Sequence, residues 1–116
     1  MSKIGLVIID HGSKRKEAND MIHDVVKSVQ KQNPDIIVSG AHMELAGPTI
    51  EDGINECLEK GAKEIYAQPF MLSPGRHVTK DIPEIVTEVA KKHPNISIKV
   101  GSFLGLNKKI ADIILE

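Results

Sequence analysis

Two histidines in the sequence stand where parallel α/β folds place their chemistry. His11 comes directly after a continuous apolar run at residues 4–9. His77 follows a second apolar run, at residues 64–70, at the end of a loop. Loops at the carboxyl ends of parallel strands carry the functional groups of such folds. We therefore expect the two loops to meet and to bring the two imidazoles face to face across one crevice.

A carboxylate accompanies the two histidines. Glu44 directly follows a third apolar run, at residues 36–43, and falls on the same predicted edge. Two imidazoles and one carboxylate suit a divalent first-row metal such as Co, Ni, Fe or Zn, and they also suit acid–base work near neutral pH. His11, Glu44 and His77 are therefore candidate metal ligands, with the two histidines as candidate catalytic groups. His42, on the strand face of Glu44, is expected to be a satisfied core histidine.

Basic residues flank both histidines. Ser13, Lys14 and Arg15 are predicted to open the first helix, whose free N–H groups and positive dipole end favour an anion. Arg76 and Lys80 would add positive charge from the other loop. Such a run is more commonly a solvated surface, but cations at a helix N-terminus oppose the dipole. A ligand that carries several carboxylates would offset that cost.

The elements that position these residues alternate between strand and helix. Apolar runs too short for helices predict four strands, at residues 4–9, 36–43, 64–70 and 96–100. Apolar residues at helical spacing predict four helices that begin near Ser13, Pro48, Asp81 and Asn107. Ser13 and Asp81 are predicted as helix caps.

This alternation predicts a three-layer α/β fold built on a parallel sheet with right-handed crossovers. A flavodoxin-like strand order, 2-1-3-4, is the simplest, and residues 1–116 should form a single domain. In that order the first and third strands are neighbours, so His11 and His77 fall at the switch point of the sheet.

The composition excludes several classes of protein. With 41% hydrophobic and 27% charged residues, the chain resembles an ordinary globular protein. A net charge of -1 and 3% aromatic residues do not suit a nucleic-acid partner. No apolar run approaches the roughly 18 residues of a membrane span. The single cysteine, Cys57, excludes an internal disulfide and a thiolate zinc cluster, and is expected to be a small buried hydrophobe. We expect no signal peptide and a cytoplasmic location.

Three ordered motifs resemble a known family. They are residues 10–13, Asp-His-Gly-Ser; residues 42–48, His-Met-Glu-Leu-Ala-Gly-Pro; and residues 69–83, which contain Pro-Phe-Met-Leu, Gly-Arg-His and Asp-Ile-Pro. Together they look like the small sirohydrochlorin chelatases, the short relatives of the cobalt and iron chelatases of cobalamin and sirohaem synthesis. The likeness covers roughly residues 4–106. The Gly-Arg-His form is most similar to the sirohaem ferrochelatases of plants, but without their cysteine-bearing extension, so no iron–sulfur cluster is expected.

The resemblance implies a lyase that inserts Fe2+, Co2+ or Ni2+ into sirohydrochlorin, with no nucleotide and no organic cofactor. His11 and His77 match the two functional histidines of the family, and Glu44 matches a carboxylate at the metal. The carboxylates of the substrate are expected to meet Ser13, Lys14, Arg15, Arg76 and Lys80. Longer relatives carry two such lobes around one cleft, so the resemblance also implies a homodimer.

Two other functions stay open on the same residues. A metal-binding or metal-delivery protein without catalysis would use the same histidines and glutamate. A phosphohistidine enzyme would also place a His-Gly pair after its first strand. Enzymes of that kind carry arginine directly before the histidine, and this chain has Asp10 there and no glycine-rich phosphate loop.

Overall fold

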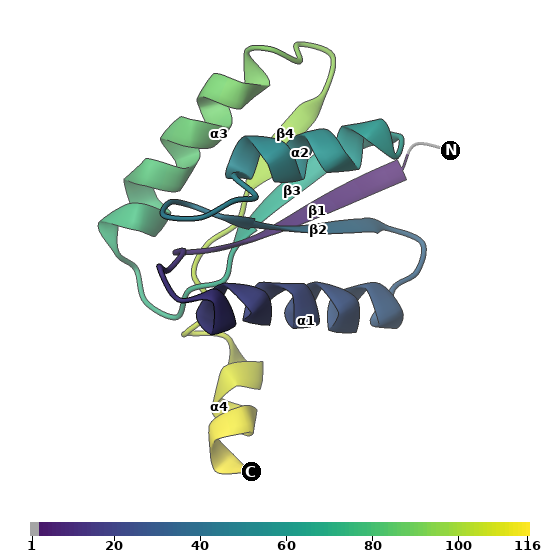
Figure 1. Ribbon diagram of the computed structural model, residues 1–116. Coiled ribbons are helices and arrows are strands. Elements are labelled where there is room, and N and C mark those ends of the chain that lie inside the picture. Colours follow the sequence, from purple (N-terminus) through teal and green to yellow (C-terminus); the bar gives the residue numbers. More distant parts are fainter. Residues whose placement is uncertain (1–2) are drawn as a thin grey trace.

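The fold is built on one all-parallel sheet of four strands, in the order β2-β1-β3-β4 (Figure 1). The computed structural model describes residues 3–116. The strands are β1 (Lys3–Asp10), β2 (Ile37–His42), β3 (Ala62–Pro69) and β4 (Ser97–Val100). The predicted order 2-1-3-4 is confirmed.

Helices cover both faces of the sheet and complete the predicted three layers. They are α1 (Lys16–Gln32), α2 (Ile50–Glu59) and α3 (Ile82–Ala90), with a short π-helical segment, η1 (His77–Asp81), joined to the start of α3. A fourth helix, α4 (Lys108–Leu115), follows β4. Helix α1 lies on one face, and α2 and α3 lie on the other (Figure 1). Every connection between successive strands is therefore a helical crossover.

The core sits mainly between the sheet and the pair α2 and α3. Val7 and Ile9 of β1 point into it, whereas Ile8 points to the other face and packs near Ile22 of α1. Burial of one such side chain stabilises the fold by roughly 1.5–3 kcal/mol. Cys57 of α2 is fully buried in the larger core, as expected, and burial raises the pKa of its thiol above 9.0.

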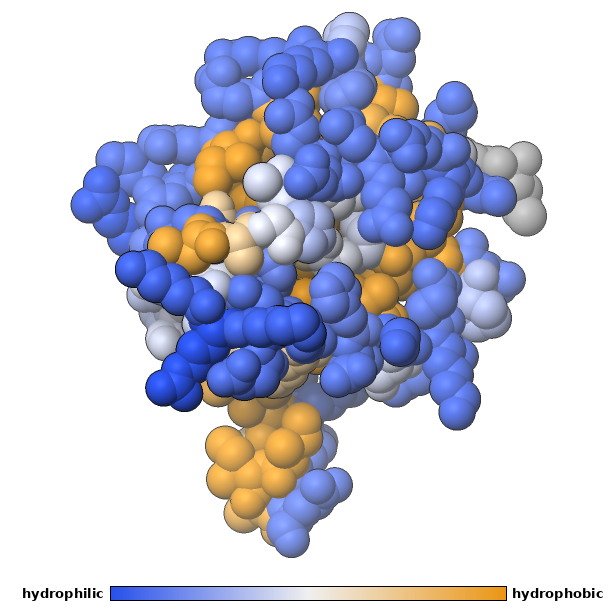
Figure 2. Space-filling model, in the orientation of Figure 1, coloured by the Kyte–Doolittle hydropathy of each residue, from blue (hydrophilic) through white to orange (hydrophobic). Residues whose placement is uncertain are grey.

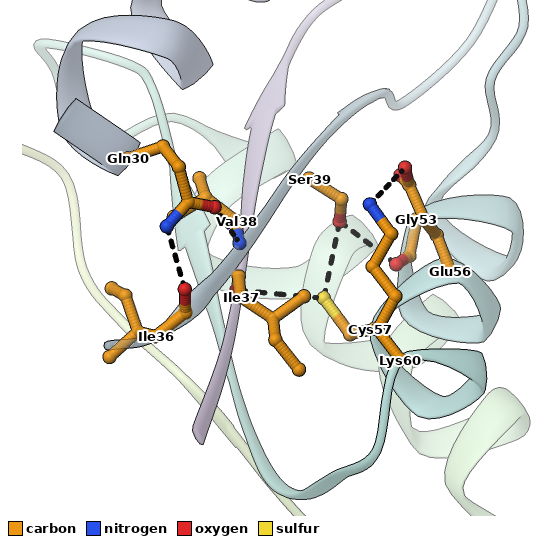
Figure 3. A network of polar contacts seen from close by, with 9 residues as sticks. All are labelled: Gln30, Ile36, Ile37, Val38, Ser39, Gly53, Glu56, Cys57 and Lys60. Atoms are coloured by element: carbon orange, nitrogen blue, oxygen red, sulfur yellow. Dashed lines mark hydrogen bonds and ion pairs between the residues drawn. The ribbon is translucent and has the colours of Figure 1, made fainter. Parts of the chain in front are cut away.

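Polar contacts tie α1 and α2 to the edge strand β2 (Figure 3). The Gln30 side chain donates to the Ile36 carbonyl oxygen at 2.7 Å and accepts from the Val38 N–H at 3.0 Å. The Ser39 hydroxyl donates to the Gly53 carbonyl oxygen at 2.9 Å. These bonds satisfy buried or half-buried polar groups and hold the two helices against β2.

The first two helices begin later than the sequence predicts. Helix α1 begins at Lys16, because the Ser13 hydroxyl accepts a bond from the Arg15 N–H, at 3.0 Å, and so forms a turn ahead of the helix. Helix α2 begins after Thr49, whose side chain accepts from the Asp52 N–H while Asp52 accepts from the Thr49 N–H. This reciprocal capping box, rather than Pro48, defines the start of α2.

The third helical segment begins earlier than the sequence predicts. The Gly75 carbonyl oxygen accepts bonds from the N–H groups of Val78 and Thr79, which starts the helical turn before His77. Asp81 therefore lies inside a helical turn, with φ -64° and ψ -49°, and its side chain caps no helical N–H. The prediction of Asp81 as a capping residue is wrong.

Helix α4 projects away from the three layers (Figure 1). The Asn107 side chain caps it by accepting from the Lys109 N–H at 2.8 Å, and none of the residues of α4 is buried. Ile114 and Leu115 are 77% and 82% exposed, and apolar surface gathers on this helix (Figure 2). Across residues 3–116, no helix combines the length and the apolar character needed to cross a bilayer.

Candidate functional site

The two sequence-predicted histidines lie in contact at the carboxyl edge of the sheet. His11 directly follows β1, and His77 opens η1 after the neighbouring strand β3. Their ring centroids are 4.1 Å apart, with 60° between the ring planes. Their side chains are 53% and 40% exposed, so both rings are open to a ligand. The contact falls at the switch point, because the chain leaves β1 toward α1 on one face and leaves β3 toward α3 on the other.

Glu44 stands beside His11. Its N–H donates to the His11 carbonyl oxygen at 3.1 Å, so the pairing of β1 and β2 continues into the two loops. Its Oε1 atom lies 4.0 Å from Nε2 of His11. That distance is too long for a hydrogen bond, so the two side chains are neighbours without a direct bond.

Gly12 allows the loops of His11 and Glu44 to approach this closely. Its φ is +95°, in the left-handed region that favours glycine. A Cβ atom at this position would stand 1.8 Å from the Glu44 carbonyl oxygen and 3.3 Å from Cβ of His42. The glycine of the Asp-His-Gly motif is therefore required by backbone contact with the second loop.

A buried acid–imidazole pair lies beneath these loops. His42 is 1% exposed, and its Nδ1 lies 2.5 Å from Oδ1 of Asp10. Within residues 3–116, Nε2 of His42 has no hydrogen-bond partner, so this core histidine is satisfied at only one of its two nitrogens. Sequence reasoning gave Asp10 no structural role. The sequence signal for this pair is that Asp10 and His42 each end one of two neighbouring strands.

A second acid–imidazole pair holds His77. Oδ2 of Asp81 lies 2.9 Å from Nδ1 of His77, one helical turn earlier, and Oδ1 of Asp81 lies 3.9 Å from Nε of Arg76. Sequence reasoning missed this partner, because Asp81 precedes Ile-Pro and so matches a helix-capping signal. The spacing of four residues between the histidine and the aspartate was the signal for the contact.

The predicted anion-binding residues are all in the two histidine loops or next to them. Four of their side chains are cationic and exposed: Lys14, Arg15, Arg76 and Lys80. The Ser13 N–H is already occupied, because it donates to the Asn19 side-chain oxygen at 2.9 Å, while Asn19 donates back to the Ser13 carbonyl oxygen at 2.7 Å. At the predicted start of the first helix, the exposed cations Lys14 and Arg15 are therefore available to bind an anion. The Ser13 N–H is not available, because Asn19 accepts its hydrogen bond.

Two shallow hollows flank the histidine contact. One, of about 250 Å³, is lined by residues that include His11, Ser13 and Phe70. The other, of about 280 Å³, is lined by residues that include Glu44 and Asp81. Both are smaller than the roughly 300–1,000 Å³ pockets that enclose drug-sized ligands. A larger hollow of about 450 Å³ lies between α2 and α3 and contains neither His11 nor His77.

The three predicted ligands do not form a ready-made metal cage. Among residues 3–116, no three His, Cys, Asp or Glu side chains form a group arranged to hold a metal ion. The structure brings His11 into contact with His77 and near Glu44, but it does not converge all three on one point.

Comparison with known proteins gives matches along nearly the whole chain. The model of the CbiX family matches residues 5–116. Over 110 residues the chain is 40% identical to the chloroplastic sirohydrochlorin ferrochelatase of Arabidopsis thaliana. This match covers 95% of this chain and 49% of the Arabidopsis protein. The chain is also 28% identical over 122 residues to the sirohydrochlorin cobaltochelatase of Methanococcoides burtonii. That match covers 98% of this chain and 93% of the Methanococcoides protein.

A solved structure also matches over nearly the whole chain. The sirohydrochlorin chelatase SirB from Bacillus subtilis subspecies spizizenii, in complex with cobalt, superimposes with a TM-score of 0.89 at 26% identity. The match covers 97% of this chain and 48% of the SirB chain. The chain therefore spans about half the length of the Arabidopsis and Bacillus relatives and nearly all of the Methanococcoides one.

Proposed function

Because this chain belongs to the CbiX family, we propose that it inserts a divalent metal ion into sirohydrochlorin. The observation that carries the proposal is the contact between His11 and His77, 4.1 Å apart at the carboxyl edge of the sheet, with Glu44 beside His11. The reaction joins one metal ion to one macrocycle and releases the two protons of the pyrrolic nitrogens. The metal is a substrate, and Fe2+, Co2+ and Ni2+ all suit imidazole and carboxylate ligands.

The side chains at the site divide the work of this reaction. The imidazoles of His11 and His77 hold the metal ion through nitrogen, which binds more loosely than a thiolate site and allows the ion to leave for the ring. Glu44 supplies negative charge and is exposed, so its carboxylate closes on the ion as the ion arrives. The same groups accept the protons that leave the pyrrolic nitrogens as the metal enters.

The cations around the site bind the carboxylates of the macrocycle. Sirohydrochlorin carries many acetate and propionate groups, and charge-assisted hydrogen bonds to such groups are about twice as strong as neutral ones. The groups that make these contacts are Ser13, Lys14, Arg15, Arg76 and Lys80. Ser13 contributes through its hydroxyl, since its N–H is occupied by Asn19.

A second copy of the chain completes the cleft. Three features support a homodimer. The two hollows beside the histidines are small, and helix α4 exposes apolar side chains. The Arabidopsis and Bacillus relatives are also about twice as long as this chain, which matches only about half of each. The second copy supplies the opposite wall for the macrocycle. We further propose that the protein works in the cytoplasm, with no nucleic-acid or membrane partner.

An anaerobic insertion assay tests the proposed function. The protein is mixed with sirohydrochlorin and Fe2+, Co2+ or Ni2+, separately and in competition, and the absorption spectrum of the macrocycle reports insertion. His11→Ala and His77→Ala should each slow insertion by about 10² or more, as loss of a positioned acid–base group does. His23→Ala, an exposed change within α1, is the matched control and should keep the full rate.

Two outcomes would contradict the proposal. Equal rates in the unchanged protein and both site variants would remove the assigned roles. Tight metal binding by the unchanged protein, with no acceleration of insertion, would instead favour a metal-delivery protein of the same fold.

A further inference from the structure

The two histidines in contact have different surroundings. Nδ1 of His77 lies 2.9 Å from Oδ2 of Asp81, within hydrogen-bond distance. Within residues 3–116, neither ring nitrogen of His11 has a hydrogen-bond partner, and the nearest carboxylate oxygen, from Glu44, is 4.0 Å from Nε2. One imidazole is therefore held by a carboxylate and the other is not.

The local backbone holds Asp81 in place. His77 and Asp81 are the first and last residues of η1, so four residues separate them and their side chains lie on one side of the helical turn. The Ile82 N–H donates to the His77 carbonyl oxygen, which closes this turn. Val78 and Ile82 are buried in the same turn and fasten it to the core. The contact is thus supported by packing and by the main chain.

Both oxygens of the Asp81 carboxylate have donor neighbours. Oδ2 faces His77, and Oδ1 lies 3.9 Å from Nε of Arg76. A carboxylate accepts hydrogen bonds and has no proton to donate. The ring nitrogen that faces it therefore carries the proton, and the lone pair of the neutral imidazole is on the other nitrogen, Nε2.

We propose that Asp81 is a positioning residue that fixes His77 in the tautomer with a proton on Nδ1 and a lone pair on Nε2. His77, rather than His11, is then the imidazole that takes the metal ion first, since its lone pair has a fixed location. A carboxylate behind a ligating imidazole orients the ring and raises its basicity as a ligand. The inference rests on the proposed metal-insertion function and assigns different tasks to its two histidines.

Nitrogen NMR of the full chain tests the tautomer directly. Protein labelled with 15N at histidine is measured free of metal at about pH 8.5, where an ordinary imidazole is neutral. The signals of His77 are assigned by their loss in His77→Ala. The unchanged protein should show a protonated Nδ1 and an unprotonated Nε2 for His77, whereas Asp81→Asn should show a mixture of tautomers, because an amide can donate as well as accept.

Anaerobic Co2+ titration tests the functional consequence. Asp81→Asn should bind Co2+ about 10–100-fold more weakly than the unchanged protein, the usual effect of removing the partner of a ligating histidine. Glu84→Gln is the matched control, since it removes one negative charge from the first turn of α3. It should keep the tautomer, and its Co2+ affinity should change by no more than about twofold. Asp81→Glu keeps a carboxylate and should restore the Nδ1–H tautomer and part of the affinity.

Each contrary result overturns the inference. A protonated Nε2 on His77 of the unchanged protein would do so even if Asp81→Asn does not fold. A folded Asp81→Asn with the original tautomer and Co2+ affinity would make Asp81 purely structural. Neither measurement depends on insertion, so a protein that fails the chelatase assay but passes both tests refutes the proposed function and leaves the Asp81 contact intact.

Discussion

Asp10 and His42 meet across the ends of the first two strands, with Oδ1 of Asp10 2.5 Å from Nδ1 of His42. The two residues are also register partners in the pairing of β1 with β2. Asp10 precedes His11, and His42 stands two residues before Glu44. The pair therefore sets the spacing of the two strand ends from which the site residues continue.

Asp10→Ala should destabilise the protein by about 1–3 kcal/mol, the usual cost of leaving a buried polar group without a partner. His42 would then lack a partner at both ring nitrogens, since Nε2 already has none within residues 3–116. Urea unfolding of Asp10→Ala, His42→Leu and the double variant measures the coupling. We expect a coupling energy of about 0.5–3 kcal/mol, and strictly additive effects would contradict the pairing.

Gly12→Ala should lower the stability of the fold and, on the proposed function, the rate of metal insertion. The new Cβ atom would collide with the Glu44 carbonyl oxygen, and the positive φ adds strain of about 1–2 kcal/mol. Gly75→Ala is the matched control, because a Cβ atom there meets nothing within 4 Å. Thermal unfolding should separate the two variants by at least about 1 kcal/mol. Equal stability of Gly12→Ala and Gly75→Ala would contradict a close contact between the loops of His11 and Glu44.

Stability should fall as the pH rises above about 9, with Cys57 as one cause. Burial raises the pKa of its thiol above the ordinary 9.0, so the unfolded chain releases this proton at a lower pH than the folded chain. The folded state then binds more protons, and linkage makes stability decrease with pH. The contribution is complete below about pH 9 and is lost as the pH approaches the raised value.

Urea unfolding at several pH values from 8 to about 10.5 checks this sign. Cys57→Ala should flatten the decline relative to the unchanged protein. Tyr66 also has a raised pKa, because its exposed hydroxyl donates a hydrogen bond to Glu64, and it too would make stability decrease with pH. Tyr66→Phe is the control that separates this contribution from that of Cys57. An equally steep decline with and without Cys57 would contradict a role for the buried thiol.

Charges on α4 should weaken self-association and leave the isolated fold intact. Ile113 and Ile114 are 61% and 77% exposed, so Ile113→Lys with Ile114→Lys removes no core contact. On the proposed homodimer, sedimentation should show a smaller dimer fraction for this variant than for the unchanged protein, while the stability of the monomer changes by no more than about 0.5 kcal/mol. Lys108→Ala with Asp112→Ala changes the polar side of the helix and is the control. Identical sedimentation of all three proteins would exclude α4 from the interface.

The fold could be predicted because its signals are periodic and local. Apolar runs and helical spacing predicted four strands and four helices, and alternation predicted the strand order, which the structure confirms. The start of the third helical segment could not be predicted from these signals. Asp81 before Ile-Pro matches a cap, but the Gly75 carbonyl oxygen begins the turn earlier, and the carboxylate then faces His77.

The site could be predicted only in part, for a related reason. The contact of His11 with His77 follows from strand order, because residues after neighbouring strands meet at one edge. The roles of Asp10, Asp81 and Asn19 depend on side-chain contacts made after the backbone is in place, and no residue type alone shows them. The catalytic, metal-binding and substrate-binding roles of the predicted residues stay predictions.

Gln30 of α1 occupies main-chain groups at the start of β2, which is an edge strand of the sheet. Its side chain occupies the Ile36 carbonyl oxygen and the Val38 N–H, two main-chain groups that an added strand would need on β2. Unprotected edge strands invite pairing with other chains and aggregation. A strand that arrived here would have to break both bonds and detach the last turns of α1. The Gln30 side chain thereby protects the start of β2 from pairing with another chain.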